Sequence, residues 1–142
     1  MQQFISGHND YLFSNKITAN NLSPALMINS SDLFEEDQIW VNDLEELLNS
    51  NISNNTYKIF QLAYDLSISE RQLRRKCKEL LGCTPNQLFR RVRIQRASIY
   101  LSRRRFKTIS QVAYAVGYRD VPSFKNHYFN LLGRSVNDDI GK

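Results

Sequence analysis

The sequence predicts an all-α protein in which two helix-turn-helix units are joined by a long linker helix. Apolar residues recur with a period near 3.6, a helical-pair pattern occurs twice, and no stretch alternates as a strand would. A chain of 142 residues that is 42% hydrophobic can bury a core of this kind. We expect residues 39–142 to form one bipartite domain, with a first unit at about 43–83, a linker helix at about 84–104 and a second unit at about 107–136.

The first 38 residues lack a sustained period. They are rich in Asn and Ser, and this predicts an acidic arm or linker with one short element. The pattern changes at Ile39, because Trp40, Leu44 and two further leucines then fall at helical spacing before a polar stretch over residues 49–55. A first helix is therefore expected to begin at Ile39.

The pattern that starts at Ile59 returns at Ile109. Ile-x-Gln-Leu-Ala-Tyr-x-Leu over residues 59–66 matches Ile-x-Gln-Val-Ala-Tyr-x-Val over residues 109–116. One residue is added in the second turn, after which Leu73, Cys77 and the Leu-Leu-Gly of residues 80–82 match residues 124, 128 and 131–133. The repeat implies two copies of one unit, each made of a helix, a tight turn and a second helix.

The second helix of the first copy has its own start and stop residues. Ser69 and Gln72 form a capping box, and Gly82 suits the left-handed conformation that ends many helices. The preceding helix has a weaker N-cap, because Lys58 stands where a capping Ser or Thr is usual.

The linker helix and the second copy show the same features. Thr84-Pro85-x-Gln87 combines an N-cap, a proline at the first helical position and a third-position glutamine, and predicts a helix that runs to about Arg104. Thr108 and Gln111 repeat the capping box. Gly117 lies in the second turn, where glycine adopts a positive φ at little cost.

The net charge of +5 conceals an uneven distribution. Residues 1–42 carry −4 and residues 43–142 carry +9, and residues 69–107 alone carry +11. A positive field of that density favours a polyanion as partner. An alternative role for the acidic arm is to fold back on the basic helices as a weak autoinhibitor.

Residues 69–81 divide into two helical faces. The apolar stripe, expected to pack on the preceding helix, contains Leu73, Cys77, Leu80 and Leu81. The basic face, at i, i+3, i+4 and i+7, contains Arg71, Arg74, Arg75 and Lys78. A helix about 12 Å across fits the major groove of B-DNA, where arginine can donate two hydrogen bonds to guanine. Double-stranded DNA is therefore the expected partner.

Four motifs occur together in the chain. They are Ser69-x-x-x-Leu73-x-Arg75-Lys76, Gly82-x-Thr84-Pro85, Arg91-x-Arg93-Ile94-x-x-Ala97 and Ile109-x-x-Val112-Ala113-x-x-Val116-Gly117-Tyr118. Over about residues 43–136 the chain thus resembles the DNA-binding domain of AraC/XylS-type transcription regulators. Its Arg-Lys-x-Lys and Thr-Pro-Asn-Gln stretches are most similar to output domains of bacterial hybrid two-component sensors. The resemblance implies sequence-specific DNA binding, with two recognition helices in successive major grooves.

The resemblance also implies residue roles. In the first recognition helix Arg71, Arg74 and Arg75 would contact base edges, with Lys78 and Lys76 nearer to phosphates. In the second, Pro122, Ser123 and Asn126 occupy the base-reading positions, and Lys125 would contact the backbone.

The chain departs from the family pattern at two places. Asn126 and Phe129 stand where the family usually has arginine and lysine, so we expect the first unit to dominate affinity. Residues 135–139 replace the usual Thr-Pro…Tyr closure, so the last short helix is expected to be frayed or absent.

Other classes of function find little support. The only cysteines and histidines are Cys77, Cys83, His8 and His127, which lack zinc-ligand spacing, and no cofactor is expected. His127 and Tyr128 have no carboxylate or nucleophile at a suitable spacing, so the chain is not expected to be an enzyme. Neither a membrane span nor a secretion signal is apparent, which predicts a cytoplasmic protein.

Two alternatives to DNA reading stay open. One is a protein-interaction module with the same fold that does not read DNA, and the other, less favoured, is binding of structured RNA. RNA polymerase or a sensor protein are further candidate partners. Residues 1–42 are too short for a receiver domain, so we expect either an output fragment of a longer regulator or a stand-alone member.

Overall fold

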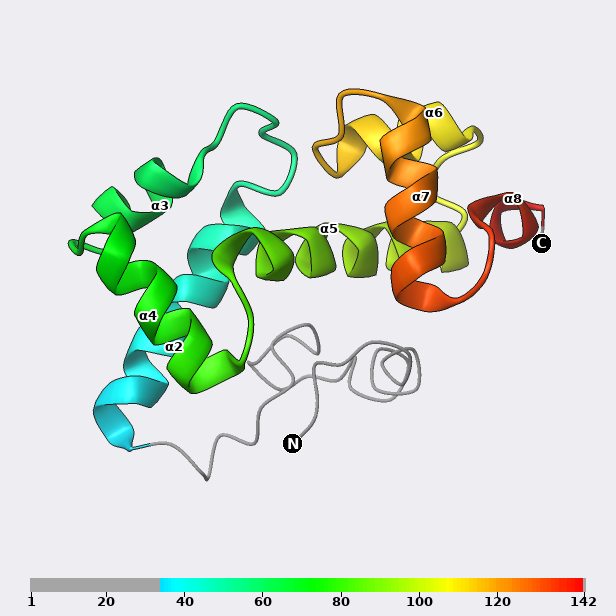
Figure 1. Ribbon diagram of the computed structural model, residues 1–142. Helices are drawn as coiled ribbons and strands as arrows, with labels where there is room; N and C mark the ends of the chain where they lie inside the picture. Colours follow the sequence, from blue (N-terminus) through cyan, green and yellow to red (C-terminus); the bar gives the residue numbers. More distant parts are fainter. Residues whose placement is uncertain (1–33, 142) are drawn as a thin grey trace.

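The computed structural model describes residues 34–141, and every regular element in that range is a helix (Figure 1). The helices are α2 (Glu35–Ser50), α3 (Ile59–Asp65), α4 (Glu70–Leu81), α5 (Pro85–Ser102), α6 (Ile109–Ala115), α7 (Val121–Leu132) and α8 (Val136–Ile140). The predicted all-α class, with two helix-turn-helix units on a linker helix, is confirmed. The folding back expected of the acidic arm concerns residues 1–38, of which only residues 34–38 lie in the described range.

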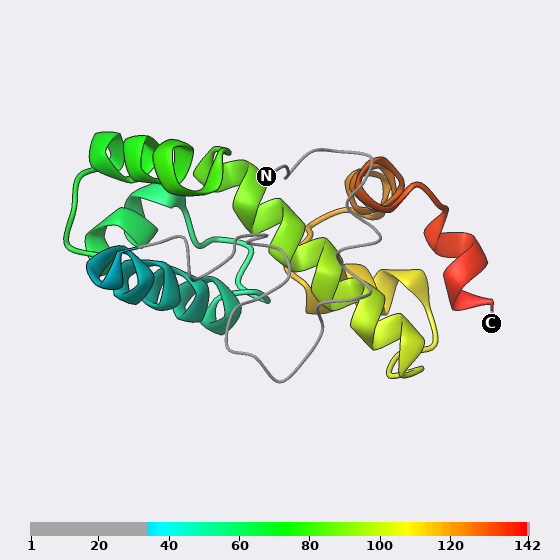
Figure 2. The same cartoon turned by 90° about the horizontal axis from the view of Figure 1, so that it is seen from below.

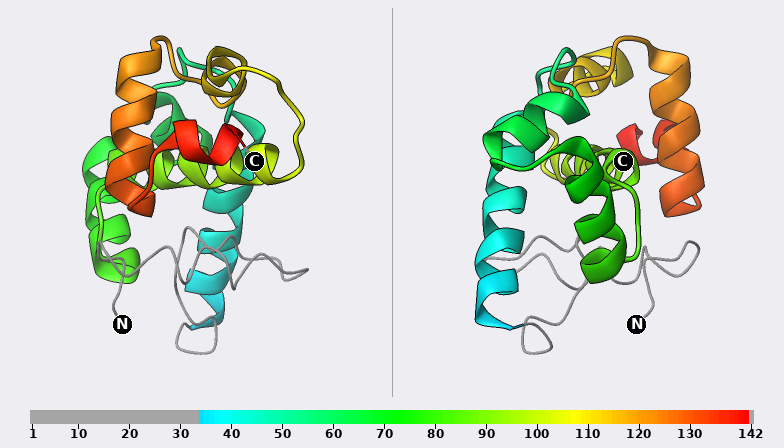
Figure 3. Two further views of the ribbon diagram at one scale, coloured as in Figure 1. Left: turned by 90° about the vertical axis from the view of Figure 1, so that its right-hand side faces the viewer. Right: turned by 60° about the vertical axis from the view of Figure 1, so that its left-hand side comes forward.

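The long helix α5 runs between the two units. It packs against α2 and α4 at one end and against α6, α7 and α8 at the other. Two views at right angles to Figure 1 place α4 and α7 on the same side of α5 (Figures 2 and 3). The two second helices of the repeat can therefore approach one surface together.

The predicted capping boxes form at three helix starts. The Ser69 hydroxyl accepts from the Gln72 N–H at 3.1 Å, and the Gln72 side chain accepts from the Ser69 N–H at 2.9 Å. The same reciprocal pairs start α5 and α6. At the start of α3 the side-chain amide oxygen of Gln61 accepts from the Lys58 N–H at 2.6 Å, but the Lys58 side chain has no acceptor and returns no capping bond. This helix is capped from one side only, as the sequence predicts.

The buried residues form one hydrophobic core that extends through both units and along α5. In the first unit the buried residues include Leu44, Leu62, Leu73, Cys77 and Leu88. In the second they include Ile94, Val112, Phe124, Tyr128 and Val136. Burying one such side chain contributes about 1.5–3 kcal/mol, so this core holds both units on the linker helix.

Helix α2 begins at Glu35, so the start predicted at Ile39 is wrong. The first turn holds Glu35, Glu36 and Asp37, whose charges are favourable at the positive end of the helix dipole. This turn buries no apolar residue, so the apolar period does not reach it. Four residues assigned to the arm are thus helical.

The end of α5 is close to the predicted one at about Arg104, whereas α8 differs from the prediction. Helix α5 ends at Ser102, and the Arg104 and Arg105 N–H groups bond back to the carbonyls of Leu101 and Tyr100. The expected fraying of the last helix is wrong, because α8 forms five residues with Ser135 as its N-cap. Its Asp139 accepts hydrogen bonds from Tyr128 at 2.5 Å and Arg134 at 2.7 Å.

Candidate nucleic-acid interface

One face of α4 gathers four cationic side chains in solvent. Arg71, Arg74, Arg75 and Lys78 are all exposed, whereas Leu73, Cys77 and Leu81 on the other side are buried. Only Arg74 is engaged within the described residues, by an ion pair of 3.1 Å with Glu70 one turn earlier. The other three cations are left facing water, where a polyanion can reach them.

Lys76 does not belong to this basic face. Its ammonium lies 3.7 Å from the Asp37 carboxylate and 4.9 Å from the centre of the Trp40 ring, and both residues are on α2. Lys76 thus joins α4 to α2, and this contact does not support the expected place of Lys76 near phosphates. The sequence could not show this, because Asp37 lies in the segment assigned to the arm.

Part of the positive charge of the linker helix is also structural. Arg91 is 9% exposed, and burial lowers the pKa of its guanidinium. Arg96 donates to the side chain of Asn49 at 2.8 Å, which ties α5 to α2. The charge of +11 over residues 69–107 thus overstates what a ligand can meet.

Arg93 joins the two units. Its guanidinium donates to the carbonyls of Ile52 at 3.3 Å and Asn54 at 3.0 Å, and lies 3.9 Å from the centre of the Phe89 ring. Gly117, in the turn of the second unit, packs against the Ile52 carbonyl and the Arg93 side chain. A Cβ added to Gly117 would clash with the Ile52 carbonyl oxygen and lie 2.8 Å from Arg93 Nε. The loop after α2, the linker helix and the second turn therefore meet at one point, which we call the Arg93 junction.

The exposed face of α7 carries much less charge. Pro122, Lys125 and Asn126 are exposed, and Ser123 is half-buried with its N–H donated to Asp120 at 2.8 Å. This bond lowers the pKa of the Asp120 carboxyl. Lys125 is the one cation of α7, and the next turn presents Phe129, which is 56% exposed.

The comparisons with known proteins point to one family. A family model described as a helix-turn-helix domain matches residues 62–138, more than half of the chain. A transcriptional regulator with an AraC-type DNA-binding domain, from Chromobacterium violaceum, has a similar structure with 26% sequence identity and a TM-score of 0.68. The chain belongs to the AraC-type helix-turn-helix family. AraC-type proteins are DNA-binding transcription regulators and not enzymes.

The structural likeness extends over most of the AraC-type domain. The similarity to the Chromobacterium protein covers 76% of this chain and 95% of that one. A DNA-binding transcriptional dual regulator from Escherichia coli K-12 has 25% identity and a TM-score of 0.63, over 70% of this chain and 87% of that one. The C-terminal domain of AraT, a response regulator from Geobacillus stearothermophilus, shares the fold at 20% identity and a TM-score of 0.64, over 86% and 88%. Comparison with curated proteins gives no match.

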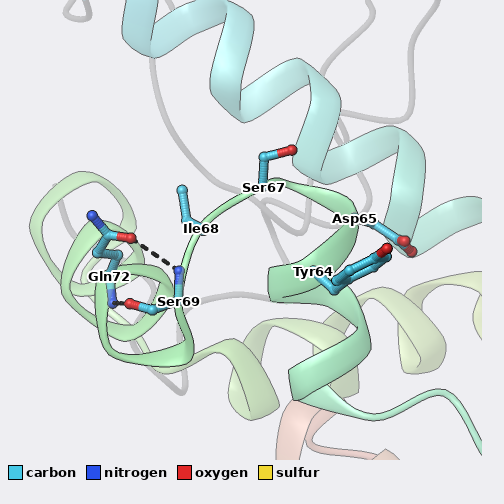
Figure 4. Close-up of a pocket in the computed structure, with 6 residues that line it drawn as sticks. All are labelled: Tyr64, Asp65, Ser67, Ile68, Ser69 and Gln72. Carbon is cyan, nitrogen blue, oxygen red and sulfur yellow. Dashed lines mark hydrogen bonds between the residues drawn. The ribbon is translucent and has the colours of Figure 1, made fainter.

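The AraC-type domain has an open hollow of about 630 Å³ at its first turn. Figure 4 shows its lining, which comes from the end of α3, the turn and the first turn of α4, with the two bonds between Ser69 and Gln72 drawn. Tyr64 at its rim is 82% exposed. The hollow is shallow and leads onto the start of α4, so it is part of the candidate interface.

Tyr118 and His127 hold the second turn of the AraC-type domain against α7. The Tyr118 hydroxyl lies 2.7 Å from His127 Nδ1, and burial and the charge of Arg90 lower the pKa of this imidazole.

Within residues 34–141 no helix has the length and apolarity that crossing a bilayer requires. Nor do the described side chains include a cluster of three or more His, Cys, Asp or Glu suited to a metal ion.

Proposed function

We propose that this AraC-type domain binds double-stranded DNA in a sequence-specific manner and regulates transcription, with α4 and α7 in successive major grooves. The observation that carries the proposal is the exposed basic face of α4, placed on the same side of α5 as α7. Half-sites about one helical turn apart follow from this arrangement.

The residues of α4 divide into base and phosphate contacts. Arg71, Arg74 and Arg75 are proposed to reach base edges, and Lys78 to contact phosphate. The pair between Arg74 and Glu70 does not prevent this, because an exposed ion pair is worth at most about 1 kcal/mol.

The second reading helix is proposed to contribute less. Pro122, Ser123 and Asn126 would contact bases, and Lys125 the backbone. With one cation on α7 against four on the basic face of α4, α7 releases fewer counterions from DNA, so the first half-site should carry most of the affinity.

Selection of bound sequences from a random DNA pool tests the proposal directly. It should return a bipartite site with a strong and a weak half, about one helical turn apart. Binding to the selected site should weaken with salt, with log K falling by about 0.9 per phosphate contact for each unit of log salt. A flat salt slope, or no preference over random DNA, would contradict the proposal.

Three single variants separate the expected roles. Arg75→Ala should cost about 1–3 kcal/mol on the selected site and less on random DNA, because it removes a base contact. Lys78→Ala should weaken both equally and lower the salt slope by about 1. Lys76→Ala is the matched control: its side chain is held by α2, so the slope should stay at the wild-type value.

A second candidate function is a protein-interaction module. The exposed Phe129 on a face with few cations favours it, since apolar area at the second reading helix suits a protein partner better than phosphates. RNA polymerase or a sensor protein would be such a partner. Capture of either by the purified protein after nuclease treatment, without a DNA shift, would support this function.

A further inference from the structure

The outward face of α2 carries four exposed carboxylates around an exposed apolar side chain. Ile39 is 55% exposed, on the side of α2 opposite to buried Val41, Leu44 and Leu48. Around it, at −4, −3, +4 and +7, lie Glu35, Glu36, Asp43 and Glu46, which we call the acidic face. The ion pairs found among the described residues use none of these carboxylates.

A basic counterpart lies at the other end of the molecule. The turn after α5 exposes Arg103, Arg104, Arg105 and Lys107, which we call the basic turn. Beside it the half-buried rings of Tyr100 and Phe106 pack edge to face at 5.3 Å, and Arg105 lies 5.5 Å from the centre of the Tyr100 ring. No carboxylate within residues 34–141 forms an ion pair with these four cations. Both surfaces thus combine unpaired charge with partly exposed apolar atoms, and their charges are opposite.

The two surfaces cannot meet within one molecule. Figure 2 shows α4 and α7 along one edge of the molecule, and α2 and the turn after α5 along the opposite edge, at its two ends. The left view of Figure 3 shows the same separation from the side. Both surfaces therefore stay accessible when α4 and α7 face DNA.

Helix dipoles explain the positions of only some of the charged residues in the acidic face and the basic turn. Glu35 and Glu36 are favourable in the first turn of α2, and arginines are favourable where α5 ends. Asp43 lies in mid-helix, and Glu46 is near the negative end of α2, where the dipole disfavours a carboxylate. Arg104 has a φ of 51°, a conformation in which glycine would be less strained. These residues are better explained by a partner than by the stability of their own helices.

We propose that the acidic face of one molecule docks on the basic turn of a second copy, in a head-to-tail contact between molecules at adjacent DNA sites. Such a heterologous contact joins two different surfaces and can be repeated along a line of sites. Exposed ion pairs are weak, so free molecules should remain monomeric at micromolar concentration. DNA raises the effective concentration of neighbours to about millimolar, and the same contact then becomes significant.

The test compares binding to one selected site with binding to two. Because the contact is head-to-tail, two sites in direct repeat should bind cooperatively, by about fivefold or more, at one phase of a spacer series that spans about one helical turn. Two sites in inverted orientation bring like surfaces together and should show no cooperativity. Added salt should weaken the cooperativity on direct repeats, because these charges are exposed.

Charge reversal identifies the surfaces. Asp43→Lys with Glu46→Lys, or Arg105→Glu with Lys107→Glu, should each abolish cooperativity, and the four changes together should restore it. Arg105→Lys with Lys107→Arg keeps the charges and is the matched control, with wild-type cooperativity expected. Circular dichroism should confirm that every variant is folded.

The outcomes separate this inference, which rests on the proposed function, from the proposed function itself. Independent binding of the wild type to direct repeats, or cooperativity that survives charge reversal, would overturn the head-to-tail contact. Weaker binding of the Arg105→Glu and Lys107→Glu variant to a single site would overturn it too, and would assign the basic turn to DNA. Absence of single-site binding by the wild type would instead contradict the proposed function.

Discussion

Two lysines separated by one residue on α4 have different surroundings and different expected roles. Lys78 is exposed beside three arginines, whereas Lys76 is held between Asp37 and Trp40. The helical period alone separates the faces of α4, so the four residues of the basic face could be predicted from the sequence. The role of Lys76 could not, because its partners lie on another helix.

Glycines with similar backbone angles differ in what surrounds them, and this predicts different costs of substitution. Gly117 has a φ of 92° and packs on the Arg93 junction, whereas Gly82 has a φ of 74° and no atom within 4 Å of an added Cβ. Gly82→Ala should cost about 1–2 kcal/mol, for the left-handed backbone alone. Gly117→Ala should cost about 2–3 kcal/mol, because the Ile52 carbonyl must also move.

Urea unfolding of both glycine variants measures this difference. The folded Gly82→Ala variant should bind DNA with wild-type affinity, since Gly82 lies outside the Arg93 junction. Equal unfolding free energies for the two variants would show that the close approach at Gly117 is not strained by a methyl group.

At the scale of one element, α8 shows how a short helix depends on its neighbours. Five residues cannot form a stable helix alone. Here Ser135 caps the first turn, Val136 is buried, and Asp139 accepts bonds from Tyr128 and Arg134. The fraying predicted from residues 135–139 fails because the hydroxyl that holds Asp139 comes from α7. Tyr128 is recognisable in the sequence as a core residue, but its partner is not.

Removing the Asp139 carboxylate should melt α8 and leave α7 folded. Asp139→Ala should lower the free energy of unfolding by about 1–3 kcal/mol, because the buried Tyr128 hydroxyl loses its acceptor. Amide exchange of residues 136–140 should accelerate while that of α7 stays slow. Asp138→Ala, at an exposed position, is the control and should change stability by less than about 0.5 kcal/mol.

The same contact predicts a loss of stability at alkaline pH. Burial, and then the hydrogen bond to Asp139, raise the pKa of Tyr128 above that of an unfolded-chain tyrosine, about 10. The neutral phenol therefore contributes stability that is fully present below about pH 10 and is lost as the pH rises further, at up to about 1.4 kcal/mol per pH unit.

Unfolding free energies in urea between about pH 8 and 11.5 measure this loss. Tyr128→Phe should show a smaller decrease above pH 10 than the wild type, because one ionisable group is removed. A residual decrease is expected, since burial also raises the pKa of Tyr118. Parallel curves for wild type and Tyr128→Phe would assign the alkaline loss to other groups.

At the scale of the whole molecule, the repeat made the fold predictable, but it did not show how the two units are placed. The offset from Ile59 to Ile109 and the capping boxes predict both helix pairs and the linker between them. Arg93 is one contact between the linker helix and the first unit, and its partners are the main-chain carbonyls of Ile52 and Asn54. Every residue has a main-chain carbonyl, so the residue types do not show which carbonyls Arg93 contacts.

Loss of the Arg93 junction should relax the preference for half-site spacing. One base pair inserted between half-sites should cost the wild type about 1–3 kcal/mol, the size of a mismatched base pair. Arg93→Ala should reduce this penalty, because the first unit's loop is no longer tied to the linker helix. Arg96→Ala removes a bond to α2 alone and should keep the wild-type penalty.

Gel shifts with a spacing series measure both variants. Thermal unfolding of the same samples shows whether Arg93→Ala is folded at the binding temperature. An unchanged spacing penalty in folded Arg93→Ala would mean that the packing of α5 alone fixes the two units.

The Arg93 junction also bears on how the chain folds. Ile52 and Gly117 are far apart in sequence, so their contact closes a long loop and is entropically costly until α5 has formed between them. Once this contact has formed, each unit stabilises the other, because opening the loop after α2 removes the surface against which the second turn packs. The two helix-turn-helix units, although built from one repeated pattern, should therefore unfold together in one cooperative transition.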